Sequence, residues 1–390
     1  MDLRLLPCLL LILISSCMQP AKPGLDEGKS PQAETQSTYQ YPGKPLRVGV
    51  VGLVHTHVHW ILGREKWGDI EIVGITEPNQ ELAAQYSEQH GYSMDLVYED
   101  LPSMLEAVKP EAVLAFNTIY DHLSVVEMCA PKGIHVMVEK PLAVSYAHAQ
   151  QMAALAREHE IQLLTNYETS WYGSNQRAYE VAIEEGKLGD LRRMVFHTGH
   201  PGPIEIGCNA EFLEWLTDPV LNGGGALTDF GCYGANLATW FMKGKTPHTV
   251  TALTQQIKPD LYPKVEDEAT ILLAYDQAQV IIQASWNWSH SRKDMEVYGK
   301  HGYLICKNGE DIIIMENEED GPAESKASPL PMGIHDPFAY LNQVVKQDEL
   351  PTPFSVSSLE NNLIVMQILE AAKYSAAKGE SVHWDDFFQD

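Results

Sequence analysis

Leu46-Arg-Val-Gly-Val-Val51-Gly52 is the stretch that decides the fold: a short β-branched run that ends at a glycine. We expect it to form a buried strand, followed by a helix through Trp67. Further apolar runs at 70–76, 112–116, 134–138 and 161–164 alternate with helical patterns at 79–91, 121–130 and 145–159. Because strands alternate with helices, the chain predicts an α/β fold with a parallel sheet wound on both faces.

The loop after the first strand is where a dinucleotide would bind, since ligands of such sheets lie at the carboxyl ends of the strands. A G-x-G-x-x-G fingerprint needs three glycines, but the chain has Gly52, Val54 and His57 at these positions, which makes the loop alone a weak signal. Glu77 ends the second strand, where a carboxylate accepts hydrogen bonds from the adenine-ribose hydroxyls. Since no Arg or Lys follows closely to hold a 2′-phosphate, we expect NAD rather than NADP.

The histidines of His55-Thr-His57-Val-His59 raise the alternative of a metal site, because an H-x-H pair at the end of a strand can bind a metal. Three alternating histidines cannot share one face of a helix. No further set of His and Asp recurs at the ends of the later strands. We therefore expect no metal here, and we expect one or two of these imidazoles to line the cofactor loop.

Glu139-Lys140-Pro141 follows the apolar run at 134–138. A lysine at the mouth of a parallel sheet lies beside the bound cofactor. There, desolvation can lower the pKa of its ammonium towards the range of proton transfer. The alternative for this tripeptide alone is an ordinary Glu-Lys pair on a surface loop.

A second motif runs from Gly223-Gly-Gly to Asp229 and Tyr233. If a helix begins after the glycines, at about 100° per residue, Asp229, Tyr233, Asn236 and Trp240 fall on one stripe of its surface. A carboxylate and a phenol one turn apart form a plausible acid/base pair. The alternative is an amphipathic helix that shows this polar face to solvent.

Together these two motifs resemble those of the Gfo/Idh/MocA family of NAD(P)-dependent sugar oxidoreductases, and the resemblance extends over about residues 46–390. It implies an N-terminal Rossmann domain with a doubly wound parallel sheet, which we expect at 45–166. It further implies a C-terminal α/β domain for substrate and oligomerisation, which we expect at 167–390, built on a large, open, mainly antiparallel sheet. Members of the family are often dimers or tetramers through this sheet, so we expect a homodimer or homotetramer. The C-terminal helix is expected to pack back on the Rossmann domain.

The resemblance also implies roles for individual residues. Lys140 corresponds to the catalytic lysine, Asp229 to the carboxylate of the motif, and Tyr233 stands where many members have a catalytic histidine. In this interpretation the Lys140 ammonium lowers the pKa of Tyr233, which takes the proton of a sugar hydroxyl as hydride passes to the nicotinamide. The residues expected to bind the cofactor are Gly52, Val54, His55, His57, Glu77, Asn117, Thr118, His122, Glu139, Lys140 and Asn166.

For the sugar we expect mainly aromatic faces, with a histidine-containing loop over the pocket. The residues expected to bind the substrate are Tyr167, Trp171, His197, Asn236 and Trp286.

The N-terminal segment predicts export. Leu5 to Ile14 is far shorter than the roughly 20 residues of a spanning helix, but it suits the apolar part of a secretory signal. Ile14-Ser-Ser-Cys17 resembles the bacterial lipobox, in which the cysteine carries lipid. We expect a signal at 1–17, a flexible tether at 18–44 and a membrane-anchored lipoprotein in the periplasm or at the cell surface. An ordinary signal peptide or a misassigned start codon is the alternative.

The composition restricts the partners. The chain has 27 Lys+Arg against 53 Asp+Glu and a formal net charge of −26, which repels nucleic acid and anionic membrane surfaces. We therefore expect a small sugar as partner, no nucleic acid, and membrane contact only through the lipid anchor. The cysteines expected to remain as free thiols are widely spaced: Cys129, Cys208, Cys232 and Cys306.

Export bears on the predicted function, because an exported enzyme meets little free NAD. We expect an oxidoreductase that moves hydride between the carbon of a sugar hydroxyl and a tightly held NAD. One alternative is an NAD-dependent enzyme that cleaves glycosides by transient oxidation at C3 and elimination. A second alternative is an anchored sugar-binding protein without catalysis.

Overall fold

The computed structural model describes residues 41–346 and 350–388. The predicted signal peptide, its lipidation site Cys17 and nearly all of the predicted tether lie outside these residues. Among the residues described, every helix is too short or too polar to cross a bilayer.

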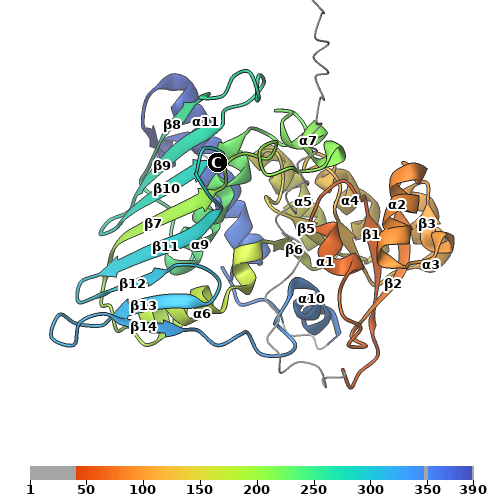
Figure 1. The fold of residues 1–390 in the computed structure, drawn as a ribbon, viewed down its shortest axis with the longest axis horizontal. Coiled ribbons are helices and arrows are strands. Elements are labelled where there is room, and N and C mark those ends of the chain that lie inside the picture. Colours follow the sequence, from red (N-terminus) through yellow and green to blue (C-terminus); the bar gives the residue numbers. More distant parts are fainter. Residues whose placement is uncertain (1–40, 347–349, 389–390) are drawn as a thin grey trace, which may run out of the picture.

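Six parallel strands form the first sheet, in the order β3-β2-β1-β4-β5-β6 (Figure 1). The first strand, β1, pairs with a neighbour on both sides and is almost entirely buried, which explains why its sequence is a continuous apolar run. This sheet confirms the predicted doubly wound fold. Its strands are β1 (Leu46–Val51), β2 (Ile70–Thr76), β3 (Val97–Tyr98), β4 (Ala112–Ala115), β5 (His135–Glu139) and β6 (Leu163–Asn166).

Three of the helices between these strands, α2, α4 and α5, follow the sequence pattern, whereas α3 was not predicted and the first helix differs from its predicted extent. The predicted helix through Trp67 is wrong, because α1 ends at Leu62. It begins late, since the amide of His55 donates to the Phe116 carbonyl oxygen (2.9 Å) and holds the chain in a turn. The helices of this part are α1 (Val58–Leu62), α2 (Gln80–His90), α3 (Leu101–Val108), α4 (His122–Cys129) and α5 (Tyr146–Glu158), with short 3-10 turns η1 (Met94–Leu96) and η2 (Ala130–Lys132).

Nine strands form the second sheet, in the order β14-β13-β12-β11-β7-β10-β9-β8-β15. All neighbours pair antiparallel except β7 and β10, so the predicted mainly antiparallel sheet is confirmed. The strands are β7 (Leu191–Gly199), β8 (Thr249–Gln255), β9 (Glu268–Ala274), β10 (Gln279–Ser285), β11 (Arg292–Gly299), β12 (Tyr303–Cys306), β13 (Asp311–Met315), β14 (Ala323–Lys326) and β15 (Val382–His383).

Helices cover one face of this second sheet and join it to the first (Figure 1). The long helix α11 packs on β8 and α9, and it also contacts α5 and β6, where Lys373 Nζ donates to the Val144 carbonyl oxygen at 3.1 Å. Helix α10 returns to β1 and β2. The elements are η3 (Glu168–Trp171), α6 (Gly173–Tyr179), η4 (Glu180–Glu184), α7 (Ala210–Leu216), α8 (Ala226–Asp229), α9 (Gly231–Phe241), α10 (Pro337–Lys346), α11 (Leu359–Lys378) and α12 (Trp384–Phe387).

The helix predicted after the triple glycine is interrupted at Phe230, where α8 ends and α9 begins. The Phe230 carbonyl oxygen accepts a hydrogen bond from the Thr198 hydroxyl of β7 at 2.9 Å. Before α8, the backbone passes very close to the segment that leads into β9, since a Cβ on Gly225 would lie 1.9 Å from the Glu266 carbonyl oxygen. The glycines therefore let the backbone of α8 approach the second sheet.

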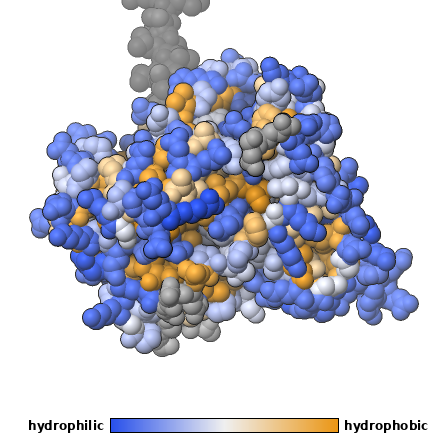
Figure 2. Space-filling model, turned by 180° about the vertical axis from the view of Figure 1, so that it is seen from behind, coloured by the Kyte–Doolittle hydropathy of each residue, from blue (hydrophilic) through white to orange (hydrophobic). Residues whose placement is uncertain are grey.

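The surface seen from behind is mostly hydrophilic, as the net charge of −26 leads one to expect, and apolar groups gather near its middle (Figure 2). The side of the second sheet away from the helices carries two exposed apolar side chains on neighbouring strands, Leu253 of β8 and Leu272 of β9. The four cysteines beyond Cys17 form no disulfide, as predicted.

Candidate active site

A buried ion pair joins the two motifs that the sequence singled out. Lys140 follows β5 and Asp229 ends α8, and less than a tenth of either side chain is exposed. The Lys140 ammonium contacts one Asp229 carboxylate oxygen and donates to the Asp229 carbonyl oxygen at 3.0 Å. Trp286 Nε1 donates to the other carboxylate oxygen at 3.0 Å. The fold thus places an oriented ammonium at the carboxyl edge of the parallel sheet.

This pairing keeps both groups charged. Burial by itself lowers the pKa of Lys140, but the adjoining Asp229 carboxylate outweighs burial and raises it. Burial likewise raises the pKa of Asp229, and the ammonium outweighs that effect and lowers it. The prediction that desolvation lowers the pKa of Lys140 is therefore wrong, because a carboxylate is in direct contact with the ammonium.

Tyr233 lies next to this pair but differs from its predicted state. Its ring is buried, with the ammonium of Lys140 5.2 Å and that of Lys293 5.4 Å from the ring centre. Burial, together with the charge of Glu168, raises the pKa of Tyr233 well above its usual value. The prediction that Lys140 lowers this pKa is wrong, since loss of water around the phenol dominates. Tyr233 keeps its proton.

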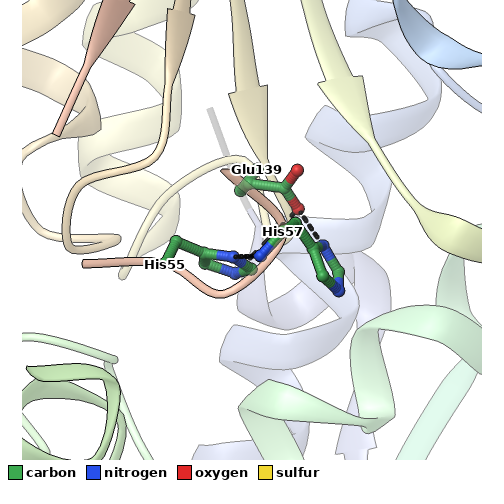
Figure 3. Close-up of side chains that lie close together, drawn as sticks. All are labelled: His55, His57 and Glu139. Atoms are coloured by element: carbon green, nitrogen blue, oxygen red, sulfur yellow. Dashed lines mark hydrogen bonds and ion pairs between the residues drawn. The ribbon is translucent and has the colours of Figure 1, made fainter. Parts of the chain in front are cut away.

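Glu139 organises the other half of the site (Figure 3). One carboxylate oxygen lies 2.8 Å from His57 Nδ1, and the other accepts a hydrogen bond from Asn166 Nδ2 at 2.7 Å. Trp171 Nε1 in turn donates to Asn166 Oδ1 at 2.8 Å. Burial raises the pKa of Glu139, but His57 and His55 outweigh it and lower the pKa to about 2. Glu139 is therefore a buried carboxylate held in its charged form.

His55 is buried beside Glu139. Its Nδ1 accepts a hydrogen bond from the His57 amide at 3.1 Å, while its Nε2 lies 3.9 Å from Glu139 and has no hydrogen-bond partner among the described residues. Burial lowers the pKa of His55 well below its usual value, so the ring is neutral. The structure thus brings His55 and His57 into the site, as predicted.

The end of β4 contributes two more unpaired polar atoms. Asn117 Oδ1 and His122 Nε2 are buried without a partner in the part of the chain that the structure describes. His122 Nδ1 lies 3.1 Å from the Leu142 carbonyl oxygen, and burial lowers the pKa of His122 to about 4. Gly52 faces Asn117 with φ of +79°, and a Cβ there would lie 2.8 Å from the Asn117 Cα. Only glycine suits this first position of the loop.

These unpaired atoms fit a dinucleotide. Buried polar groups are normally hydrogen-bonded, and the amide, hydroxyls and phosphates of NAD would supply partners for Asn117 Oδ1 and His122 Nε2. His55 interacts electrostatically with Glu139, Lys140 and His122, so these groups share one site.

Glu77, Val54 and Thr118, which were expected to bind the cofactor, already have hydrogen-bond partners within the protein. Both carboxylate oxygens of Glu77 already accept backbone hydrogen bonds, from Leu53 at 2.9 Å and Asn79 at 2.8 Å. The Val54 carbonyl oxygen accepts a hydrogen bond from Trp215 Nε1 at 3.4 Å, and Thr118 Oγ1 donates to Asp121 at 2.7 Å. The Glu77 carboxylate therefore holds the loop after β1 in place, and the hydroxyls of a bound ribose would share this carboxylate with the amides of Leu53 and Asn79.

The predicted aromatic faces for the sugar are mostly covered. Tyr167 and Trp286 are completely buried. Trp286 orients Asp229, and the Tyr167 ring meets Tyr233 edge-on at 5.4 Å. Trp171 is half-buried and supports Asn166. The prediction that Tyr167 and Trp286 present their faces to the substrate is wrong, since both serve the packing behind the ion pair.

Two further predicted substrate residues have other partners. Asn236 is fully buried and donates to the Val356 carbonyl oxygen at 2.7 Å, so it ties α9 to the segment before α11. His197 lies within β7 and not on a loop, and its Nδ1 is 3.0 Å from Asp294 of β11. Both side chains therefore have partners within the second domain, Asn236 in the segment before α11 and His197 in β11.

Two residues that the sequence did not single out, Glu168 and Lys293, complete the site together with His200, which was expected on a loop over the pocket. Glu168 begins η3, two residues after the end of β6, and its carboxylate contacts the Lys293 ammonium. Burial raises the pKa of Glu168, but Lys293 outweighs it and lowers the pKa to about 2. His200 is buried with its ring edge on Phe230, and burial lowers its pKa to about 4. The position of Glu168 shortly after a strand end was a signal in the sequence, whereas Lys293 comes from a distant strand and carried none.

Comparison with known proteins identifies both domains. Residues 46–167 match a model described as the oxidoreductase family with an NAD-binding Rossmann fold, and residues 176–305 match the Gfo/Idh/MocA C-terminal domain. Together the two models cover well over half of the chain.

Individual relatives are distant. The trans-1,2-dihydrobenzene-1,2-diol dehydrogenase of Xenopus tropicalis is 27% identical over 187 residues, 47% of this chain and 52% of that enzyme. The D-glucoside 3-dehydrogenase of Escherichia coli K12 is 27% identical over 208 residues, 51% and 54% of the two chains. The chain thus spans about half the length of these relatives. A crystal structure of an aldose–aldose oxidoreductase from Caulobacter crescentus, complexed with glycerol, shares the fold, with a TM-score of 0.72, 21% identity and coverage of 87% and 100%. With both of its domains matched, the chain belongs to the Gfo/Idh/MocA family of oxidoreductases.

Proposed function

We propose that the protein is an NAD-dependent oxidoreductase that acts on a hydroxyl-bearing carbon of a neutral sugar. The observation that carries the proposal is the buried Lys140–Asp229 ion pair at the carboxyl edge of the NAD-binding sheet. Bound NAD would accept or return the hydride of the substrate carbon. The net charge of −26 and the carboxylates of Glu139, Glu168 and Asp229 favour a neutral substrate over an anionic one.

Lys140 is the residue that would hold the reacting oxygen. Its ammonium has three protons, and its hydrogen bonds in the described chain go only to Asp229. The remaining proton is available to the oxygen of the substrate. Asp229, fixed by Trp286, aims the ammonium, which stabilises negative charge on that oxygen as the C–H bond breaks or forms.

The protonation states give Lys140 the role of acid. Because Asp229 raises the pKa of Lys140, the proton rests on Nζ and can pass to a carbonyl oxygen when a ketone is reduced. In the oxidative direction the step runs in reverse: Lys140 in its amine form would take the hydroxyl proton as hydride leaves the carbon, and it would become the ammonium again. Tyr233 remains protonated and can only donate or pack against the substrate.

The position of oxidation is proposed from one relative. The similarity to the Escherichia coli D-glucoside 3-dehydrogenase favours C3 of a glucoside-like ring. A 3-keto product acidifies the C2 proton, so the alternative of glycoside cleavage by elimination, with no net redox change, uses the same first step.

The decisive experiment examines the nucleotide and the products together. Denatured protein should release NAD, identified by mass spectrometry, and addition of methyl or aryl glucosides should yield either a keto-sugar or a free aglycone. A keto-sugar supports the oxidoreductase, and aglycone release without net reduction supports the cleavage route. Protein that neither contains nor binds NAD would leave only the sugar-binding alternative.

We also propose that the protein is exported and anchored through Cys17, which explains a tightly held cofactor in a compartment with little free NAD. The support is the Ile14-Ser-Ser-Cys17 sequence. Metabolic labelling with a palmitate analogue should mark the wild type and not Cys17→Ser. Labelling of both proteins would contradict the anchor.

A homodimer or homotetramer is proposed through the uncovered face of the second sheet. The support is the pair of exposed apolar side chains Leu253 and Leu272 on neighbouring strands. Light scattering should give an oligomer for the wild type and a smaller species for Leu253→Glu. An unchanged mass in the variant would contradict this interface.

A further inference from the structure

The two histidines of the H-x-H sequence after β1, His55 and His57, lie beside the carboxylate of Glu139. Glu139 ends β5, a later strand of the same sheet, and was not considered as a metal ligand in the sequence. One ligand atom each of His55, His57 and Glu139 can be chosen so that all three lie within 4.8 Å of one another. Figure 3 shows the two imidazoles, on the loop after β1, next to the Glu139 carboxylate.

Both histidines approach the same carboxylate oxygen of Glu139. Glu139 Oε2 lies 2.8 Å from His57 Nδ1 and 3.9 Å from His55 Nε2. The His55 atom is the second observation, because it is buried, faces this oxygen and has no hydrogen-bond partner among the described residues. A bound ion would give it one.

The surroundings hold the three side chains in place. Asn166 donates to Glu139 Oε1 at 2.7 Å, so it does not compete for Oε2, which lies against His57 Nδ1 at 2.8 Å. The His57 ring stacks on Trp60, with ring centres 3.9 Å apart and planes at 13°. Phe212 and Trp215 pack against His55 at 5.2 and 5.5 Å. Outer groups of this kind orient metal ligands in known sites.

We propose that His55, His57 and Glu139 bind one divalent transition-metal ion of the Zn²⁺ class. Two imidazoles and one carboxylate form a ligand set used by zinc, with further positions left to water or substrate. Imidazole nitrogen disfavours Mg²⁺ and Ca²⁺, which prefer oxygen ligands. The proposal does not depend on the proposed oxidoreductase function, since it concerns ion binding alone.

Ion binding rearranges two hydrogen bonds. His57 Nδ1 exchanges its contact with Glu139 for the metal. His55 receives the metal at Nε2 and carries its ring proton on Nδ1, so it gives up the hydrogen bond that it now accepts from the His57 amide. The loop at residues 55–57 therefore changes its hydrogen bonding when the ion binds.

The test uses the full-length protein, stripped with a chelator and free of added NAD. Titration with Co²⁺ should produce visible d–d absorption that saturates at one ion per chain, and Zn²⁺ should displace it. His55→Ala and Glu139→Gln should each weaken Zn²⁺ binding by more than the roughly 10–100-fold loss typical of an outer-shell partner. Zn²⁺ should also raise the melting temperature of the wild type and not of these variants.

A neighbouring histidine pair provides the matched control. His59 Nδ1 and His90 Nε2 lie 2.8 Å apart, and no carboxylate belongs to their pair. His59→Ala should therefore bind Co²⁺ like the wild type. Absence of a saturable Co²⁺ signal in the wild type would overturn the proposal. Equal Zn²⁺ affinity of wild type and Glu139→Gln, a variant of nearly the same shape, would overturn it as well.

Discussion

Two buried ion-pair centres in this molecule use cations in different ways. Arg64 donates from Nη1 and Nη2 to the two carboxylate oxygens of Asp69, at 2.8 and 2.7 Å, and from Nε to Asp336 at 2.7 Å. Its guanidinium is thus shared between two carboxylates, one of them in the segment that begins α10. Among the described residues, Lys140 bonds to Asp229 alone and keeps a proton for another acceptor.

The difference separates a structural centre from a functional one. The planar guanidinium matches carboxylates in a fixed fork, so Arg64 holds α10 against the Rossmann part of the fold. Lysine is a point charge whose protons can turn to a ligand. Unpaired buried polar atoms, those of His55, Asn117 and His122, gather near Lys140. The functional site is therefore the one whose cation, Lys140, still has a proton for a ligand.

The largest effect should come from removing the functional pair. We expect the double variant Lys140→Met with Asp229→Asn to lose about 10³-fold in kcat, because it removes the oriented ammonium that would hold the substrate oxygen and exchange its proton. Its free energy of unfolding should change little, since replacing a buried ion pair by uncharged groups is often neutral. Steady-state kinetics and urea unfolding measure the two quantities. A folded double variant with near-normal turnover would contradict the site.

Removing the structural cation should give the opposite result. Arg64→Met leaves two buried carboxylates without their cation and should destabilise the protein by about 3–5 kcal/mol. Urea unfolding measures the loss, and NAD affinity of the protein that remains folded should be unchanged. The control is Arg192→Met, which removes an exposed arginine near Asp190 and should cost less than about 1 kcal/mol. Equal losses in the two variants would show that Arg64 has no special role.

The structural centre also predicts a dependence of stability on pH. Burial raises the pKa of Asp336, but His335 and Arg64 outweigh it and lower the pKa to about 2, below the usual value for an aspartate. A carboxyl whose pKa is lower in the folded state stabilises the fold above the unfolded pKa, and this stabilisation is lost as pH falls towards 2.

Asp336 should accordingly contribute about 2 kcal/mol at neutral pH. Between pH 5 and pH 2.5, the free energy of unfolding of the wild type should decrease more than that of Asp336→Asn. Parallel pH dependences would refute the assignment.

The smallest effect is expected for Tyr233→Phe. Because the phenol keeps its proton, its removal should lower kcat by less than about 10-fold. The alkaline limb of the pH–rate profile should not move. A loss comparable with that of the Lys140 variant, together with a shifted alkaline limb, would restore Tyr233 as the base.

The parts of the fold that depend on a local pattern could be predicted from the sequence. The continuous apolar run of β1 and the caps of α2 at Asn79 and Gly91 were readable because burial and turn chemistry act over a few residues. Exposure of large aromatics was not readable. Trp286 and Tyr167 looked like faces for a sugar, yet packing between α8, α9 and the second sheet buries both.

By itself, the sequence determined that a Rossmann sheet is present and that Lys140, Asp229 and Tyr233 belong to one site, because short motifs encode these features. Only the tertiary structure decided their protonation. A pKa depends on which charges and how much water surround a group, and the neighbours of Lys140 and Tyr233 come from segments far away in the chain. The same reason applies to Glu139, which becomes a third ligand candidate beside His55 and His57 only when β5 aligns with the loop after β1.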